Sequence, residues 1–341
     1  MLISLLHTAL LATCCCAAAQ TPAPGGGAGE WEQVLSEAGV RGYARQRAGT
    51  DLLEFRSTAV IPASIDVVGV VLRDVEGLKR SSKSCLEARI LSQKDRNDYT
   101  FYVAYGMPIP FTNRDVVIHA TTTYDVMKGR AICELRALPV SQAPPRDGFV
   151  RITDLRAQFI IEYLGPAQTG IVYTSRVDPG GHIPDFLINY TSKHSIYSSV
   201  IDLRRASQDP KHSQAAQISP DHELVAQITH DPAQMKTIVQ NRLGEYIPER
   251  ELTRLLAEDP GVFQALVNGE GSIGEILLHG WGSRESQRMA VSALLRRLLA
   301  TRIQDPARLQ KMVEDPLLLD RILAGRGGAA AVRALLQREP K

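Results

Sequence analysis

Hydrophobic and polar residues alternate with a period of two through most of the chain between residues 30 and 178. The clearest run is Tyr99, Phe101, Val103 and Tyr105, and turns rich in Gly, Pro and Asp separate such runs. This pattern predicts a mostly antiparallel sheet with one buried face, although a one-residue slip in register would exchange the faces. One segment interrupts this alternation with a helical pattern. Ser64 is a plausible N-cap, and the apolar residues that follow it share one face of a helix.

The period changes after the turn Asp178-Pro179-Gly180-Gly181. From there Phe186, Tyr190, His194, Tyr197 and Ile201 recur every three or four residues, which predicts a long helix with one apolar stripe. A sheet with one apolar face and a helix with one apolar stripe bury these surfaces against each other. We therefore expect an α+β fold, and the periodicity alone suits a filled core as well as a hollow one.

Residues 209–341 have helical periodicity and few aromatic residues, so we expect an all-helical region there. Asp231-Pro232, Asp259-Pro260 and Asp315-Pro316 each precede an apolar-periodic run, with spacings of 28 and twice 28 residues. Asp is a favoured N-cap and Pro a favoured first helical residue. A degenerate helical repeat and simple reuse of a good cap both explain the pattern.

The length of 341 residues favours two folded units. A net charge of +2 gives no basic surplus for a nucleic acid. The sequence contains no H-E-x-x-H, C-x-x-C or G-x-S-x-G motif, and its histidines are irregularly spaced. Gly269, Gly271 and Gly274 match a dinucleotide fingerprint, but no strand precedes them, so we interpret them as helix-ending glycines. We expect no catalytic residues, no metal and no cofactor.

The first nineteen residues have the pattern of an export signal. They contain no acidic residue, carry an apolar run, and end in Ala17-Ala18-Ala19, which predicts a periplasmic or secreted protein. Residues 20–30 are predicted to be a flexible linker. In an alternative, Cys14 would be acylated and would anchor a lipoprotein. Cys85 and Cys133 fall in strand-like patterns, and we favour unpaired thiols over a disulfide bridge.

Several separated segments, in order, resemble the START (steroidogenic acute regulatory protein-related lipid transfer) domain. They include Trp31, Tyr43-Ala44-Arg45, Ile61-Pro62-Ala63-Ser64, Pro108 to Asp115, Gly148 to Arg151 and Asp178 to Phe186. The resemblance covers residues 31–208. It implies a helix-grip fold, in which a curved antiparallel sheet wraps around the C-terminal helix and leaves a tunnel. It also implies non-catalytic binding and transfer of a phospholipid, sterol or similar apolar ligand, with transient membrane contact.

The resemblance, together with the alternation, nominates residues that would line such a tunnel. They are Phe101, Val103, Tyr105, Phe159, Ile161, Tyr173, Phe186, Tyr190, His194 and Tyr197. Phe101 and Ala120 stand where sterol-binding members often place an ion pair, which favours a more apolar ligand or headgroup contacts to His119, Tyr190 or His194. Gly180-Gly181 and the loop from Met107 to Thr112 would form the gate through which a lipid enters and leaves the tunnel. Arg114 and Asp115 are expected mainly to stabilise the fold.

Two alternatives remain open at this point. Related helix-grip folds include cyclases and hydrolases, and Tyr105, His119 and His194 would be the first residues to suspect in an enzyme. In the other alternative, the first domain is a lipid sensor and the helical tail docks a protein partner.

Overall fold

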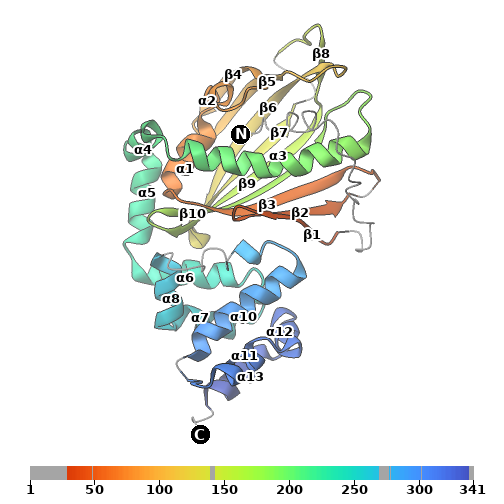
Figure 1. The fold of residues 1–341 in the computed structure, drawn as a ribbon. Coiled ribbons are helices and arrows are strands. Elements are labelled where there is room, and N and C mark those ends of the chain that lie inside the picture. Colours follow the sequence, from red (N-terminus) through yellow and green to blue (C-terminus); the bar gives the residue numbers. More distant parts are fainter. Residues whose placement is uncertain are drawn as a thin grey trace.

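The computed structural model describes residues 29–337 except for residues 48, 139–142, 269–275, 277 and 301. The expected export signal, Cys14, most of the expected linker and the fingerprint glycines lie outside the described residues. Figure 1 shows a strongly curved sheet with one long helix across it and a group of shorter helices at its lower end.

The described strands form one ten-stranded sheet in the order β1-β2-β3-β10-β9-β7-β6-β5-β4, with β8 paired to β6. All neighbours on this path are antiparallel and only the β6–β8 pair is parallel, in agreement with the predicted sheet. The strands are β1 (Glu32–Glu37), β2 (Val40–Gln46), β3 (Leu53–Ile61), β4 (Cys85–Asp95), β5 (Asp98–Tyr105), β6 (Asn113–Asp125), β7 (Arg130–Ala137), β8 (Phe149–Arg151), β9 (Asp154–Gly165) and β10 (Gln168–Asp178).

Three helices accompany the sheet on its inner side. These are α1 (Ile65–Arg73), α2 (Gly77–Ser81) and α3 (Asp185–Ala206). Helix α1 begins after Ser64 as predicted, but the Ser64 hydroxyl donates to Asp66 Oδ1 at 2.5 Å and caps no backbone N–H. Helix α3 crosses the concave face of the sheet (Figure 1), and Ile196, Val200 and Leu203 join the inward-facing strand residues in one core. The predicted α+β helix-grip fold is confirmed.

The rest of the described chain is helical, as predicted. Its helices are α4 (Pro210–Gln217), α5 (Pro220–Thr229), α6 (Pro232–Leu243), α7 (Arg250–Glu258), α8 (Pro260–Asn268), α10 (Arg284–Ala300), α11 (Pro306–Val313), α12 (Pro316–Leu323) and α13 (Gly328–Leu336). The Asp-Pro start recurs at Asp209 and Asp305, whose carboxylates accept backbone N–H groups two residues on. These additional starts break the 28-residue spacing, which favours reuse of a good cap over a repeat.

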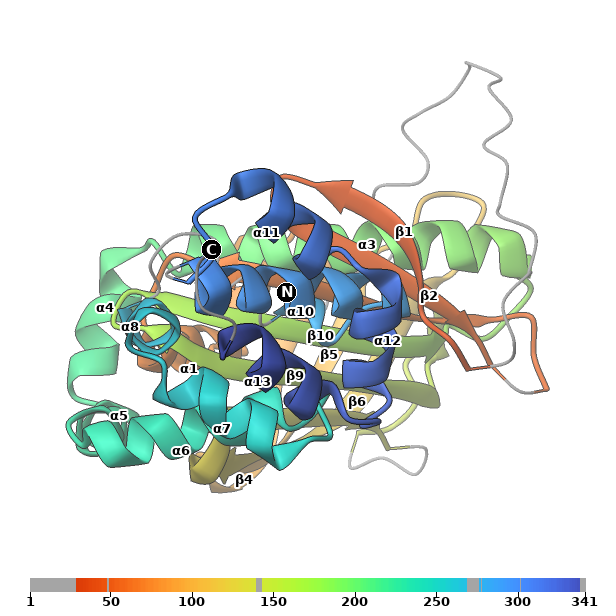
Figure 2. The ribbon, with the colours of Figure 1, turned by 90° about the horizontal axis from the view of Figure 1, so that it is seen from below.

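The helical region packs on the opposite face of the sheet from α3. Strand alternation points Ile160 and Val172 away from the inner core, and both join Leu243, Leu252 and other helical residues in a second core. Figure 2 views the helices α6 to α13 in front of β9 and β10. Helices α4 and α5 run around one end of the sheet to connect the two faces (Figure 1). None of the described helices has the length and apolar character needed to cross a bilayer.

Candidate functional site

The six predicted strand residues meet on one face of the sheet. Phe101, Val103, Tyr105, Phe159, Ile161 and Tyr173 are all buried in the inner core that α3 covers. At its centre the Phe159 and Tyr173 rings stack with centroids 4.2 Å apart and planes 6° from parallel. The alternation in the sequence therefore assigned the correct face to these strands.

Helix α3 presents a different face to the sheet from the one expected. Phe186 is 69% exposed and Tyr190 is 42% exposed, so the expectation that the aromatic stripe faces the interior is wrong for both. The buried face carries aliphatic side chains interspersed with small polar ones, such as Ile196 and Leu203 beside Thr191 and Ser195. Helix and sheet are close together here, because a Cβ on Gly42 of β2 would lie 3.2 Å from Ile196 Cδ1.

The other two stripe residues lie at the edge of this helix. His194 is half-buried on the outer side, with its ring 4.3 Å from that of Tyr190 and Nδ1 2.8 Å from the Tyr190 carbonyl oxygen. Tyr197 packs against the rim of the core and donates to Glu37 Oε1 at 3.4 Å. Neither reaches the centre of the interior. There the inner wall of α3 is formed by Ile196, Val200 and Leu203 together with Ser195 and Ser199.

Several hydroxyl groups in this interior lack hydrogen bonds. The side-chain oxygens of Ser57, Tyr105 and Ser195 are buried and have no hydrogen-bond partner within the part of the chain that the structure describes. Ser57 of β3 lies directly opposite Tyr173 of β10 in the register. Buried polar groups are rarely left unsatisfied, and each costs about 1–3 kcal/mol. The interior therefore offers unused hydrogen-bonding capacity among apolar walls.

Burial also raises the pKa of the two interior tyrosines, Tyr105 and Tyr173. It raises the pKa of Tyr173 to about 12, against a smaller opposing influence of the Ser175 hydroxyl. Burial raises the pKa of Tyr105 still further, and the neighbouring Cys85 thiol and Tyr173 act in the same direction. Both phenols are neutral at physiological pH. They can offer a hydrogen bond to a ligand, but they cannot supply a phenolate base.

Cavities border the two ends of this interior. One of about 20 Å³ lies under the first turns of α3, between Tyr105, Pro179 and Thr191. Another, of about 60 Å³, lies at the opposite end, where α1 and the sheet meet α5 and α6. Between them the side chains of the sheet and α3 are in contact. Space for a ligand of lipid size thus requires these two layers to separate.

Arg114 connects the two segments of the expected gate. Its guanidinium donates to the carbonyl oxygens of Pro179 at 3.3 Å and Gly180 at 2.8 Å, and also to that of Thr112. Gly181 adopts a φ of +75°, and a Cβ there would lie 2.9 Å from Arg114 Nη2, so a larger residue would be strained. Arg114 therefore holds the turn before α3 against the loop before β6.

Asp115, next in the chain, has a purely structural set of contacts. Its two carboxylate oxygens accept from Arg151 at 2.7 and 2.8 Å, and Tyr102 donates to it at 3.1 Å. Because Asp115 points to the outer face of the sheet, it fixes β8 against β6 and lies away from the inner core. This matches the expected role in stability.

The three residues suspected in the enzyme alternative, Tyr105, His119 and His194, do not lie together in one site. Tyr105 points into the interior, whereas His119 is on the opposite face of β6, 2.7 Å from Asp98 Oδ1, and His194 is on the outer side of α3. Phe101 and Ala120 both carry their apolar side chains in the inner core. Across the described residues no three His, Cys, Asp or Glu side chains gather as metal ligands. Cys85 and Cys133 are free and buried.

Sequence reasoning missed the serines of the interior. Ser57 follows Phe55 and precedes Ala59 on the inward positions of β3, and Ser195 lies one residue before Ile196 on α3. A serine at an inward position of an otherwise apolar strand was the available signal. On α3 the periodic stripe of Phe186, Tyr190, His194 and Tyr197 pointed to a different helix face from the one that carries Ser195.

Comparison with known proteins places this architecture in a family. A profile of the START domain matches residues 27–213. An uncharacterized protein of Pseudomonas aeruginosa is 29% identical over 179 residues, 52% of this chain and 87% of that protein. Human phosphatidylcholine transfer protein is 25% identical over 193 residues, 56% of this chain and 88% of that protein. The crystal structure of human STARD10 is 22% identical, with a TM-score of 0.50 over 55% of this chain and 76% of that chain, and shares the fold. This chain belongs to the START domain family.

Proposed function

We propose that the protein binds one lipid between its sheet and α3 and carries it between membranes without covalent chemistry. The observation that carries this proposal is that the hydroxyls of Ser57, Tyr105 and Ser195 lie within an apolar core and find no hydrogen-bond partner among the residues that the structure describes. A polar ligand group would satisfy them, and the surrounding apolar side chains would receive hydrocarbon.

The proposed ligand is a glycerolipid bound through uncharged polar groups. Neutral hydroxyls match ester carbonyls and hydroxyl groups, while Phe101 and Ala120 provide no ionic anchor at the centre. Similarity to the human relative named for phosphatidylcholine transfer supports a phospholipid. Exposing a sixteen-carbon chain to water costs on the order of 13 kcal/mol at about 0.8 kcal/mol per CH₂. A protein that shields the chain during exit lowers this barrier.

Lipid entry is proposed at the end of α3 that Arg114 holds. Ile109, in the loop between β5 and β6, is 92% exposed, and Phe186, in the first turn of α3, is 69% exposed. Arg114 ties the segments that carry them to each other, so both apolar side chains are available at one end of the interior. They would contact the bilayer while α3 moves away from the sheet.

We also propose that residues 1–19 direct export and that residues 209–341 serve the lipid-binding fold. The pattern of the first nineteen residues supports export, and N-terminal sequencing of protein recovered from the periplasm or medium would identify the cleavage site. Retention on membranes with an acylated Cys14 would support the lipoprotein alternative. The shared core of sheet and tail favours a structural role for the tail over an independent docking module.

The experiment for the main proposal is identification of the bound molecule. The purified protein is analysed by native mass spectrometry and by organic extraction, and is then offered vesicles of phosphatidylcholine. We expect one lipid per chain, and weaker retention in Tyr105→Phe and Ser195→Ala. A protein that carries no lipid and takes up none from vesicles would contradict the proposal. Turnover of a lipid that depends on Tyr105 would favour the enzyme alternative instead.

A further inference from the structure

The 60 Å³ cavity at the end of the interior away from the gate has walls contributed by both parts of the chain. Ala131, Cys133 and Ile161 line it from the inner face of the sheet, and Leu224, Val225 and Ile228 line it from α5. Helix α5 lies outside residues 27–213, the part that matches the START profile. The helical region therefore closes one end of the interior with apolar side chains.

This cavity adjoins the core that contains the hydroxyls for which the described residues provide no partner. Cys133 lies opposite Phe159 in the β7–β9 register, and Phe159 stacks on Tyr173. Ile161, in the cavity wall, is two positions further along β9, a displacement of about 7 Å at 3.3–3.4 Å per residue. A chain whose polar end meets the hydroxyls near Tyr173 thus points toward the cavity.

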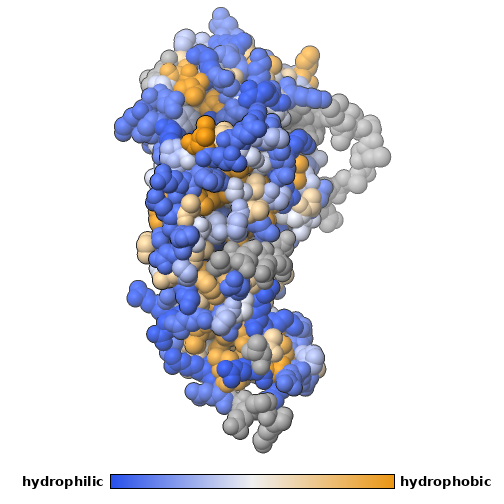
Figure 3. Space-filling view, turned by 90° about the vertical axis from the view of Figure 1, so that its left-hand side faces the viewer, coloured by the Kyte–Doolittle hydropathy of each residue, from blue (hydrophilic) through white to orange (hydrophobic). Residues whose placement is uncertain are grey.

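Polar groups at the rim hold α5 in this position. Asp221, in the first turn of α5, accepts from Arg73 Nη1 at 2.8 Å and from Tyr124 Oη at 2.8 Å, and pairs with Arg96 at 3.0 Å. His222 Nδ1 lies 2.6 Å from Asp66 Oδ2 of α1. With these groups bound to one another, most of the remaining wall is aliphatic, and its other polar side chains are Thr122, Arg130, Tyr163 and Thr229. Figure 3 shows the mostly hydrophilic surface on this side of the molecule.

We propose that the cavity under α5 receives the distal end of the acyl chain of the bound lipid, so that α5 limits the length of chain the protein carries. The inference rests on the proposed function and deepens it. Each methylene that reaches an apolar wall is worth about a fourfold factor in affinity, and one that finds no space contributes nothing or must displace α5. Chain-length selectivity therefore depends on the side chains of α5.

The test compares phosphatidylcholines with saturated chains of 12, 14, 16 and 18 carbons, offered in vesicles and quantified in the protein by mass spectrometry. Val225→Phe fills the cavity, Ile228→Ala enlarges it, and Ala226→Phe adds the same ring to the exposed side of α5 as a control. We expect Val225→Phe to lose about tenfold or more in retention of the longest chains that the wild type binds, with 12-carbon retention unchanged. We expect Ile228→Ala to shift the optimum to longer chains, and Ala226→Phe to match the wild type.

A second measurement uses the thiol in the cavity wall. Alkylation of Cys133 by N-ethylmaleimide, followed on its own peptide, should be slowed more by a bound long-chain lipid than by a short-chain one, because only a chain that fills the cavity also covers the thiol from the side of α5. Identical chain-length profiles in all variants, with no protection of Cys133, would overturn the inference while leaving lipid binding intact. Failure of the wild type to take up any chain would overturn the proposed function and this inference with it.

Discussion

Arg242 of α6 donates to Glu162 Oε2 of β9 at 2.7 Å, and both side chains are almost completely buried. The same guanidinium also donates to the Tyr163 carbonyl oxygen at 2.7 Å. Breaking a buried ion pair costs about 3–5 kcal/mol when the remaining charge is left uncompensated. Here Arg130 Nη1 remains 3.6 Å from Glu162 Oε1, so we expect Arg242→Met to lower the free energy of unfolding by about 3 kcal/mol, the lower end of that range, in urea titrations. Arg254→Met, which removes an exposed pair with Glu258, should cost less than about 1 kcal/mol. Similar losses in the two variants would contradict the prediction.

Removing the helical region would break the Arg242–Glu162 pair together with the second core. A chain that ends at Gln217 exposes Ile160, Leu164 and Val172 and leaves the buried Glu162 without Arg242. We expect this fragment to aggregate or to bind a dye such as ANS strongly, although it contains the complete match to the START profile. A monomeric, cooperatively folding fragment that binds lipid normally would show that the helical region is an independent module.

The interior hydroxyls give a prediction in which stability and binding change in opposite directions. Because Tyr105 Oη has no partner within the described structure, Tyr105→Phe should leave the free energy of unfolding unchanged or raise it by up to about 1 kcal/mol. Lipid retention should fall. Tyr43 is an equally buried control whose hydroxyl lies 3.3 Å from Ser286 Oγ, on the tail side of the sheet. Tyr43→Phe should lose about 0.5–1.5 kcal/mol and retain lipid normally. A loss of stability in Tyr105→Phe comparable to that control would mean that its hydroxyl is satisfied.

The contacts of Arg114 predict an effect on transfer kinetics. Arg114→Met keeps the approximate volume of the side chain but removes the bonds to the carbonyl groups of Thr112, Pro179 and Gly180. Each hydrogen bond that opposes opening is worth about 1 kcal/mol, or roughly fivefold in rate. We expect faster lipid exchange between vesicles, measured by fluorescence dequenching, with Arg80→Met as an exposed control. Unchanged or slower exchange would place the gate elsewhere.

The fold could be predicted from the sequence where a local pattern of hydrophobic residues or helix caps determines an element. Tyr99, Phe101, Val103 and Tyr105 alternate because they share the inner face of β5, although Tyr102 and Ala104 on its other face are buried too. Asp-Pro dipeptides begin α6 and α12 because caps act locally. The inner face of α3 could not be predicted in this way. Hydrophobicity favoured Phe186 and Tyr190, but α3 instead turns Ile196, Val200 and Leu203 toward the sheet, and this orientation exists only in the folded structure. The pairing of Arg242 with Glu162 was equally inaccessible, because it joins residues 80 positions apart.

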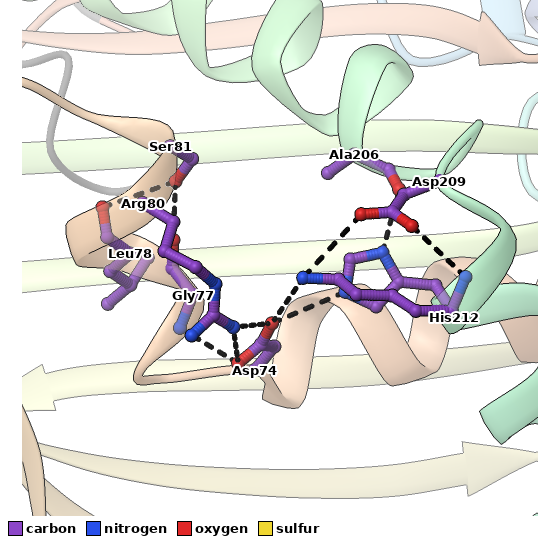
Figure 4. A network of polar contacts seen from close by, with 9 residues as sticks. Asp74, Gly77, Leu78, Arg80, Ser81, Ala206, Asp209 and His212 are labelled. Carbon is purple, nitrogen blue, oxygen red and sulfur yellow. Dashed lines mark hydrogen bonds and ion pairs between the residues drawn. The ribbon is translucent and has the colours of Figure 1, made fainter.

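The contacts that attach α4 and α5 to α1 predict how the stability of this part of the protein changes at acid pH. Burial by itself would raise the pKa of Asp66, but hydrogen bonds from Ser64 and His222 outweigh it and hold that pKa below 3.8. The pKa of Asp74 is lowered in the same way, against its burial, by His212, the Gly77 N–H and Arg80, a network shown in Figure 4. Lys211 Nζ also lies 3.8 Å from Asp74 Oδ2. A carboxylate with a lowered folded-state pKa stabilises the fold above its unfolded pKa, and that contribution is lost as the pH falls through the folded value. We therefore expect α4 and α5 to loosen below pH 3.8, seen as a falling melting temperature and as proteolysis by pepsin between α3 and α6. Asp66→Asn should be less stable near neutral pH and should lose less between pH 5 and pH 2.5. An acid transition as steep in Asp66→Asn as in the wild type would exclude the Asp66–His222 pair as its cause.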